Sequence, residues 1–156
     1  MPTTPQYDEL AKILPGVWNV RSTNFPMWLT RERKSPRFSY DLVSENPLTL
    51  RDDVSYLTAD NAEKHIVGTD KWAHDHFVWR GKGLLKIARS RWSIAGGNDD
   101  HTALAIRFDK TMFTPAGLDI IVREGVEIAE LRSLVARNAE QFGLTPEDFA
   151  SLTWLD

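Results

Sequence analysis

The stretch GVWNVRST, residues 16–23, decides how the rest of the chain is interpreted. Trp18, Val20 and Ser22 alternate with Asn19, Arg21 and Thr23, which is the period of two of a half-buried β-strand. Before it, residues 7–14 carry apolar side chains three and four positions apart, and a Pro-Gly pair ends that pattern. This order predicts a short amphipathic helix followed by a first strand at 17–23.

Seven further segments with strand character follow at close spacing, separated by turn residues. Eight consecutive antiparallel strands with short turns leave unpaired edges unless the sheet closes on itself. We therefore predict a mainly β protein, an eight-stranded antiparallel up-and-down β-barrel over about residues 16–124. A two-sheet sandwich also accommodates eight strands, so the alternation alone leaves both architectures open. The further strands are expected at Arg37–Ser44, Leu48–Leu57, Lys64–Trp72, His74–Arg80, Lys86–Ala95, Thr102–Asp109 and Leu118–Arg123.

The hydrophobic period changes back to 3.6 residues after Gly125. An apolar stripe over 126–141 predicts one helix of about four turns, with Gly143 as its C-cap. The run Thr145-Pro146-Glu147-Asp148 combines an N-cap, a proline at the first helical position and early acidic residues, so a short helix to Leu152 is expected. The C-terminal helices thus cover about residues 126–152.

Composition limits the function classes. The chain has 156 residues, of which 42% are hydrophobic and 26% charged, as in one soluble globular domain spanning 1–156. A net charge of −3 argues against nucleic acid as a partner. The chain contains no cysteine, no basic leader and no apolar run near the roughly 18 residues of a membrane helix. We expect a cytoplasmic protein without a membrane partner.

The tripeptide Gly16-Val17-Trp18, placed between a short helix and the first of eight strands, resembles the G-x-W signature of lipocalins. In that family a basic residue near the end of the last strand packs over the tryptophan, and Arg123 matches its position. The family also has a helix against the barrel wall, which the segment 126–141 resembles. The likeness implies a lipocalin or calycin barrel with a ligand cavity. Because the chain has no cysteine and no export signal, it is similar to the cytosolic members of this superfamily, including fatty-acid-binding proteins.

If Trp18 points inward, strand alternation assigns a largely aromatic barrel interior. Such side chains either fill a small barrel or line the site of an apolar or aromatic ligand. The loop 24–29 is apolar as well and is expected either to cover the barrel mouth or to pack on its rim. Interior positions also include Val20, Ser22, Leu42, Leu104 and Ile106. The predicted ligand-binding residues are Trp18, Phe38, Tyr40, Trp72, Phe77, Trp79, Trp92, Phe108 and, from the loop, Trp28.

Polar residues in phase with this interior raise the alternative of catalysis. Binding of a small hydrophobic or aromatic molecule is the first hypothesis, and a cofactor-free enzyme of isomerase, cyclase or lyase type is the second. For the enzyme, Tyr40, Asp70 and His76 are the acid/base candidates. A convergent set of buried titratable groups favours the enzyme, whereas one anchoring arginine favours the binder.

The histidines allow a third hypothesis. His74 and His76 on a strand would lie on one face, about 6.5–7 Å apart, and His65 or His101 would supply a third metal ligand. With Gly68 they match the opening G-x5-H-x-H of cupins, but no glutamate follows at the expected spacing. An H-x-H pair near a turn is more often exposed, and its phase opposite Trp79 places it outside the barrel. We therefore predict no metal and no other cofactor; the sequence leaves a homodimer open.

Overall fold

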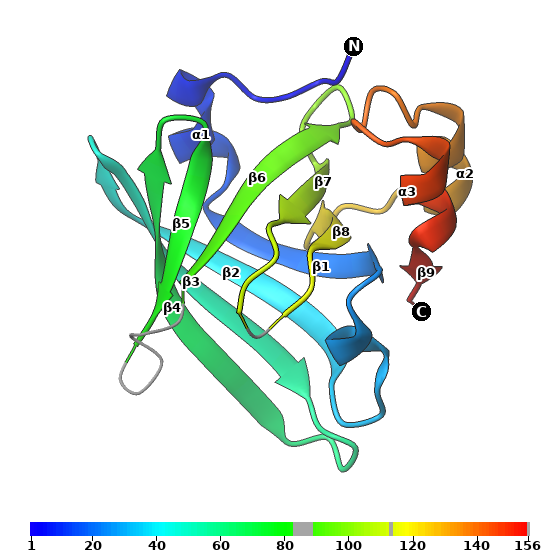
Figure 1. Ribbon diagram of the computed structural model, residues 1–156, viewed down its shortest axis with the longest axis horizontal. Coiled ribbons are helices and arrows are strands. Elements are labelled where there is room, and N and C mark those ends of the chain that lie inside the picture. Colours follow the sequence, from blue (N-terminus) through cyan, green and yellow to red (C-terminus); the bar gives the residue numbers. More distant parts are fainter. Residues whose placement is uncertain (83–88, 113, 156) are drawn as a thin grey trace.

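The computed structural model describes residues 1–82, 89–112 and 114–155. Eight antiparallel strands form a closed barrel, with helix α1 (Tyr7–Ile13) across one end and the C-terminal helices against one side (Figure 1). The strands are β1 (Gly16–Thr23), β2 (Lys34–Glu45), β3 (Leu48–Leu57), β4 (Glu63–Ala73), β5 (His76–Gly81), β6 (Arg89–Gly97), β7 (Ala103–Phe108) and β8 (Gly117–Arg123).

Each strand pairs with the next one along the chain, and β8 returns to pair with β1. Trp18 on β1 is therefore opposite both Phe38 on β2 and Arg123 on β8. This double pairing closes the ring and removes the unpaired edges. The predicted up-and-down barrel is confirmed, and the two-sheet sandwich is wrong.

A short ninth strand, β9 (Thr153–Trp154), was not predicted. It pairs with Ser22 and Thr23 of β1, beyond the part of β1 that pairs with β2. The Ser22 hydroxyl donates a hydrogen bond of 3.0 Å to the carbonyl oxygen of Thr153. The C-terminal end of the described chain is thus attached to the end of β1.

The end of the barrel beneath α1 is closed by hydrogen bonds and rings. The Trp18 indole nitrogen donates to the carbonyl oxygen of Leu14 at 2.9 Å, and the Arg123 guanidinium lies 4.5 Å from the centre of the Trp18 ring. Arg123 also donates to the carbonyl oxygens of Pro15 and Ile13. Gly16 has a φ of 126°, and a Cβ there would collide with Arg123. The expected packing of Arg123 over Trp18 is confirmed.

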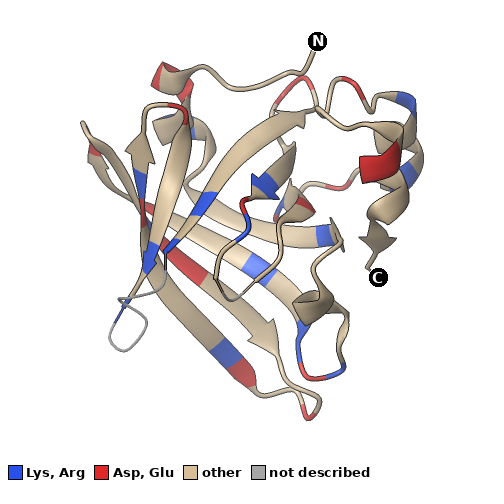
Figure 2. Ribbon diagram, in the orientation of Figure 1, with Lys and Arg blue, Asp and Glu red and all other residues tan. Residues whose placement is uncertain are grey.

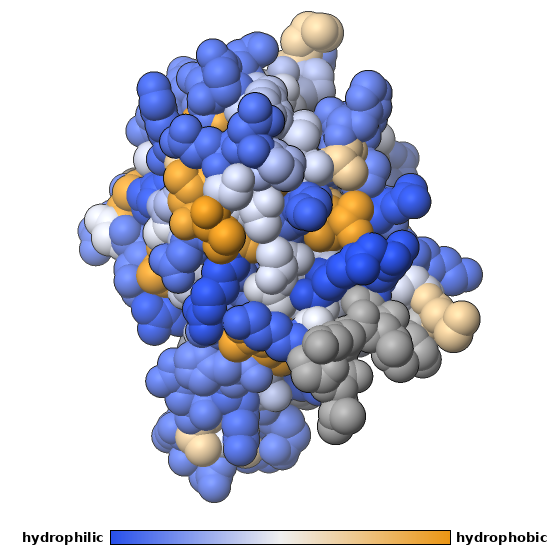
Figure 3. All heavy atoms as spheres, turned by 90° about the vertical axis from the view of Figure 1, so that its left-hand side faces the viewer, coloured by the Kyte–Doolittle hydropathy of each residue, from blue (hydrophilic) through white to orange (hydrophobic). Residues whose placement is uncertain are grey.

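The chain has two buried apolar regions, one inside the barrel and one between the barrel wall and the C-terminal helices. Strands β7 and β8 are buried on both faces, because Leu131, Val135 and Phe142 cover their outer side. Viewed from the left of Figure 1, the opposite face is mostly hydrophilic, with hydrophobic side chains in small separate groups (Figure 3). The two clusters of buried apolar residues therefore lie inside the barrel and beneath the C-terminal helices.

The predicted helix over 126–141 is wrong in extent. Helix α2 spans only Leu131–Arg137, because Glu130 before it adopts a left-handed backbone with a φ of 50°. Helix α3 (Pro146–Ser151) does form where predicted. The Thr145 hydroxyl caps it by accepting a hydrogen bond of 3.0 Å from the backbone N–H of Asp148.

Two further predictions need correction. The fifth strand begins at His76, since His74 lies in the preceding turn with a φ of 71°. Leu42 is 38% exposed and is not in the interior, because β1 begins opposite Tyr40 and leaves the rest of β2 without that neighbour. The predicted start of the sixth strand at Lys86 lies outside the described residues.

Among the described residues, no helix combines the length and apolarity needed to cross a membrane.

Candidate functional site

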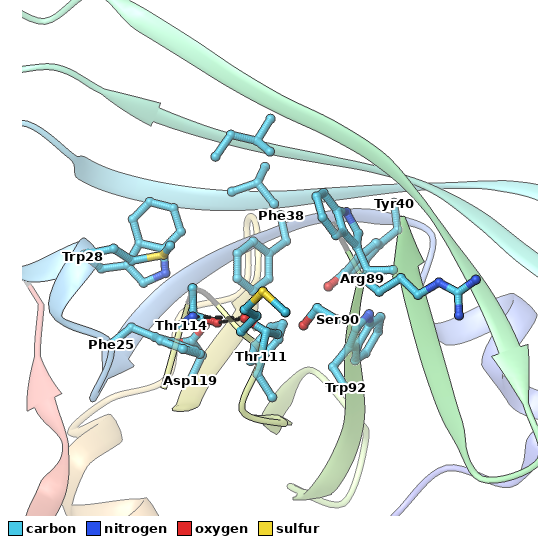
Figure 4. A pocket seen from close by; sticks show the side chains of 16 residues that line it. Phe25, Trp28, Phe38, Tyr40, Arg89, Ser90, Trp92, Thr111, Thr114 and Asp119 are labelled. Carbon is cyan, nitrogen blue, oxygen red and sulfur yellow. Dashed lines mark hydrogen bonds between the residues drawn. The ribbon is translucent and has the colours of Figure 1, made fainter. Parts of the chain in front are cut away.

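A cavity of about 720 Å³ lies inside the barrel, toward the end opposite α1 (Figure 4). Most of its lining is apolar, and aromatic rings from several strands face into it. It is lined by Phe25, Met27, Trp28, Phe38, Tyr40, Val54, Ile66, Trp79, Arg89, Ser90, Trp92, Phe108, Thr111, Met112, Thr114 and Asp119.

The predicted ligand-binding residues divide into two groups. One group lies in the cavity wall and consists of Trp28, Phe38, Tyr40, Trp79, Trp92 and Phe108. The other group, Trp18, Trp72 and Phe77, fills the barrel below the cavity. Trp72 packs against Phe77 at a centroid distance of 4.9 Å and against Tyr7 of α1 at 5.7 Å. These three residues lie outside the cavity lining and pack at the end of the barrel that α1 covers.

The loop after β1 borders the cavity. It contains the 3-10 helix η1 (Pro26–Leu29), and Phe25 and Trp28 are each only 6% exposed. The Phe25 ring packs edge-on against Phe108 at 5.3 Å, while Trp28 packs against Tyr56 at 5.9 Å. Both Phe25 and Trp28 line the cavity. The apolar loop thus forms part of the cavity wall as well as packing on the rim.

A stack of three rings runs from the closed end up to the cavity. Phe77 stacks on Trp92 at 4.5 Å, and Trp92 stacks on Tyr40 at 5.7 Å. The Trp92 indole nitrogen donates to Oδ1 of Asp70 at 2.9 Å. Opposite them, Gly68 leaves room for Trp79, because a Cβ at Gly68 would collide with the indole. The floor of the cavity is therefore held by ring packing and one buried hydrogen bond.

Two buried carboxyl groups, Asp52 and Asp70, lie next to this stack but outside the cavity wall. Burial raises the pKa of Asp52 to about 6, while burial and the neighbouring Asp52 together raise the pKa of Asp70 well above its ordinary value. Oδ1 of Asp52 and Oδ2 of Asp70 have no hydrogen-bond partner within the described residues. Burial and the nearby acids Asp52, Asp70 and Asp119 also raise the pKa of Tyr40.

A third buried carboxyl group belongs to Asp119 on β8, opposite Thr23 of β1, and it lies in the cavity wall. Asp119 has no exposed surface, and within the described chain neither of its carboxyl oxygens has a partner in hydrogen-bonding geometry. Burial raises its pKa to about 7, an effect that the nearby Thr23 hydroxyl opposes. The cavity thus contains an acid with unusual protonation at neutral pH.

Sequence reasoning identified Tyr40 and Asp70 but missed Asp52 and Asp119. Asp52 could have been found, because it is in phase with Leu50 and Val54, whose side chains are apolar. Asp119 offered only a weaker signal, a single acid within an otherwise apolar strand. With both faces of β8 buried, alternation does not tell which way that acid points.

Neither a protein-family model nor a curated protein sequence matches this chain. Solved structures do share its architecture. Lobster apocrustacyanin A1 superposes with a TM-score of 0.63 at 11% identity, covering 99% of this chain and 87% of that one. The siderocalin Ex-FABP superposes with a TM-score of 0.61 at 11% identity, covering 91% and 93%. This protein is a lipocalin-like β-barrel. At these identities the likeness establishes the fold alone.

The histidines of this lipocalin-like barrel lie away from the buried acids. His76 is next to inward-facing Phe77, so its side chain is on the opposite face, where Nδ1 contacts Oδ1 of Asp75 at 2.8 Å. The structure therefore brings Tyr40 and Asp70 close together but not His76. In the ranges 1–82, 89–112 and 114–155, no three His, Cys, Asp or Glu side chains gather as a metal site would require.

The arrangement defines what the site can do chemically. Aromatic and aliphatic groups can exclude water from a ligand of moderate size, and a few polar groups can orient it. Lys, Arg, Asp and Glu are interspersed along the ribbon in the view of Figure 2, without a basic stripe that would suit a phosphate backbone. The internal cavity is accordingly the candidate site.

Proposed function

We propose that this protein binds a small, largely apolar or aromatic molecule in its barrel cavity. The observation that carries the proposal is the cavity itself, about 720 Å³ with a mostly apolar lining. Ligand pockets typically measure about 300–1,000 Å³ and combine such a lining with a few polar groups. Removing apolar surface from water supplies roughly 25 cal/mol per Å² of driving force.

Two further features support this proposal. The loop containing Phe25 and Trp28 narrows the mouth, which would shield a bound molecule from water. The siderocalin Ex-FABP, which has a similar barrel, is described as functioning through dual ligand specificities. We propose that the protein works in the cytoplasm, since a chain without cysteine suits a reducing compartment, and that it needs no cofactor for binding.

Binding is tested with N-phenyl-1-naphthylamine, a neutral probe whose fluorescence rises in apolar surroundings. We expect saturable binding that the variant Trp79→Ala, in the cavity wall, weakens. The matched variant Trp72→Ala removes the same side chain at the closed end and should leave the probe affinity unchanged once folding is verified. Native mass spectrometry of the purified protein then identifies any retained ligand and the oligomeric state. Absence of saturable binding in the wild-type protein contradicts the proposal.

A second candidate is a cofactor-free enzyme acting on a hydrophobic molecule in the same cavity. It is favoured by one observation, the buried group of Tyr40, Asp52 and Asp70 next to the cavity floor, in which burial raises the pKa of every member. Tyr40 is the member of this group that reaches the cavity wall. If the protein is an enzyme, Tyr40→Phe should abolish conversion of the identified ligand while leaving its binding intact. Equal conversion by Tyr40→Phe and the wild-type protein contradicts this role.

A further inference from the structure

The carboxyl group of Asp119 is the least compensated polar group in the cavity wall. Its side chain is fully buried, and both oxygens lack a hydrogen-bond partner within the described residues. Burying a carboxylate in apolar surroundings is costly unless a cation or hydrogen-bond donors compensate it. The structure therefore contains a buried acceptor in the cavity wall for which the described residues supply no partner beyond the nearby Thr23 hydroxyl.

The protein supplies no described cation to this carboxyl group. Of the described residues that line the cavity, Asp119 is the one acid and Arg89 the one base. Arg89 is exposed, and Figure 4 shows its guanidinium extending away from the cavity. None of the ion pairs among the described residues involves Asp119. A positive group on the ligand would fill this gap.

The walls around the cavity also suit a cation. Phe25 and Phe38 both pack against Phe108, at centroid distances of 5.3 and 6.3 Å, and all three rings line the cavity. Aromatic faces attract cations electrostatically, most strongly where water is excluded. An apolar body could then occupy the space toward Trp79 and Trp92.

We propose that the ligand carries a basic nitrogen, and that Asp119 binds its protonated amine while the aromatic wall holds the apolar body. This inference rests on the proposed binding function and specifies its ligand class. An anionic ligand is disfavoured, because the carboxylate of Asp119 in the cavity wall would repel it. The expected order of affinity is amine, then alcohol, then carboxylate.

The test compares three molecules with the same indole body, tryptamine, tryptophol and indole-3-acetate, by isothermal titration calorimetry at pH 7.5. In the wild-type protein we expect tryptamine to bind at least about ten-fold more tightly than tryptophol, as one charge-assisted hydrogen bond provides. The variant Asp119→Asn, nearly identical in shape, should remove that preference and leave tryptophol binding unchanged. Asp41→Asn makes the same charge change on the exposed side of β2 and should preserve the preference.

A pH series supplies an independent readout. Since burial raises the pKa of Asp119 to about 7, an ammonium group must displace a proton from much of the protein at pH 6. Tryptamine affinity should fall as the pH drops from 8 to 6, and binding should release protons, an effect that Asp119→Asn abolishes.

The neighbours of Asp119 on the adjacent strands β1 and β7 are Thr23 and Ile106. The other titratable or charged groups around the cavity are Tyr40 on β2, Asp52 on β3, Asp70 on β4 and Arg89 on β6.

The outcomes separate this inference from the function on which it rests. Tryptophol binding without a preference for tryptamine, or equal weakening of both by Asp119→Asn, overturns the amine assignment and leaves small-molecule binding intact. If the neutral naphthylamine probe and all three indoles fail to bind, the binding function and the amine assignment both fall. Retained tryptophol binding in Asp119→Asn shows that this variant is folded.

Discussion

The two ends of the barrel differ in whether their buried polar groups have hydrogen-bond partners. At the closed end, the indole N–H of Trp18 and the guanidinium of Arg123 both donate to backbone carbonyl oxygens. In the cavity, Asp119 keeps two carboxyl oxygens without partners in the described structure. Buried polar groups in proteins are normally satisfied, and exceptions concentrate at functional sites. The comparison teaches that buried polar groups at the closed end are paired within the fold, whereas the cavity wall contains an acid whose pairing the proposed ligand would complete.

The largest expected effect comes from breaking the closed end. Trp18→Ala removes a fully buried indole and the surface on which Arg123 lies, so the free energy of unfolding should fall by about 3–5 kcal/mol. Urea denaturation followed by circular dichroism measures this loss. Lys71→Ala, at an exposed position of β4, is the control and should stay within about 0.5 kcal/mol of wild type. A loss below about 1 kcal/mol would show that Trp18 does not organise this end.

The pH dependence of stability tests the uncompensated acid in the cavity. Asp119 titrates at 3.8 when unfolded and at about 7 when folded, so the native protein retains a proton that the unfolded chain has lost. Stability should therefore fall as the pH rises from about 4 to about 7, by at most about 4 kcal/mol from this group. The free energy of unfolding, obtained from denaturation at several pH values, should depend less on pH in Asp119→Asn than in the wild-type protein. At pH 8 the variant should be the more stable of the two. An unchanged slope would contradict the raised pKa.

A smaller effect on stability, but a specific one on binding, is expected at the mouth. Trp28→Ala opens a wall that already borders the cavity, so it should cost about 1–2 kcal/mol, less than Trp18→Ala. Affinity for the naphthylamine probe should weaken by about ten-fold, because part of the apolar wall is lost. Parallel denaturation and fluorescence titrations measure both quantities. If Trp28→Ala leaves affinity unchanged, the loop packs on the rim without contributing to the site.

The smallest expected loss of stability comes from a substitution outside the barrel interior, and it is the reference for the substitutions inside. Thr145→Ala deletes the N-cap of α3 and should lower the unfolding free energy by about 1 kcal/mol. Thermal denaturation detects this change, while probe affinity should equal that of the wild-type protein. Weakened probe binding would show that the C-terminal helices and the cavity are coupled.

The part of the fold that sequence predicted is the part governed by local patterns. Alternation located all eight strands, and the Thr145 cap located α3. The long helix was overpredicted, because an apolar stripe over 126–141 reports burial against β7 and β8 without specifying helical backbone. His74 was placed in a strand because a left-handed turn residue has no distinct signature when it is not glycine.

The candidate site was predicted only where alternation is clear. Tyr40 and Asp70 follow from strand phase, and Trp28 follows from an apolar loop. Trp18 and Phe77 were assigned to ligand binding because phase gives the face of a strand but not the depth along the barrel axis. Which rings fill the closed end and which line the cavity depends on the position of α1 and on the cross-strand register.

The pairing of β1 with β8 has a consequence for how the barrel forms. Apart from this pair and β9, every sheet neighbour is adjacent along the chain, so the other strand pairs can assemble as successive hairpins. Joining β1 to β8 closes the ring and must overcome the entropy of the longest loop. Trp18 and Arg123 lie opposite each other at that junction, and the contact of the guanidinium with the indole ring stabilises the closed barrel. The two residues on which the lipocalin resemblance rests therefore also form the contact at the junction that completes the barrel.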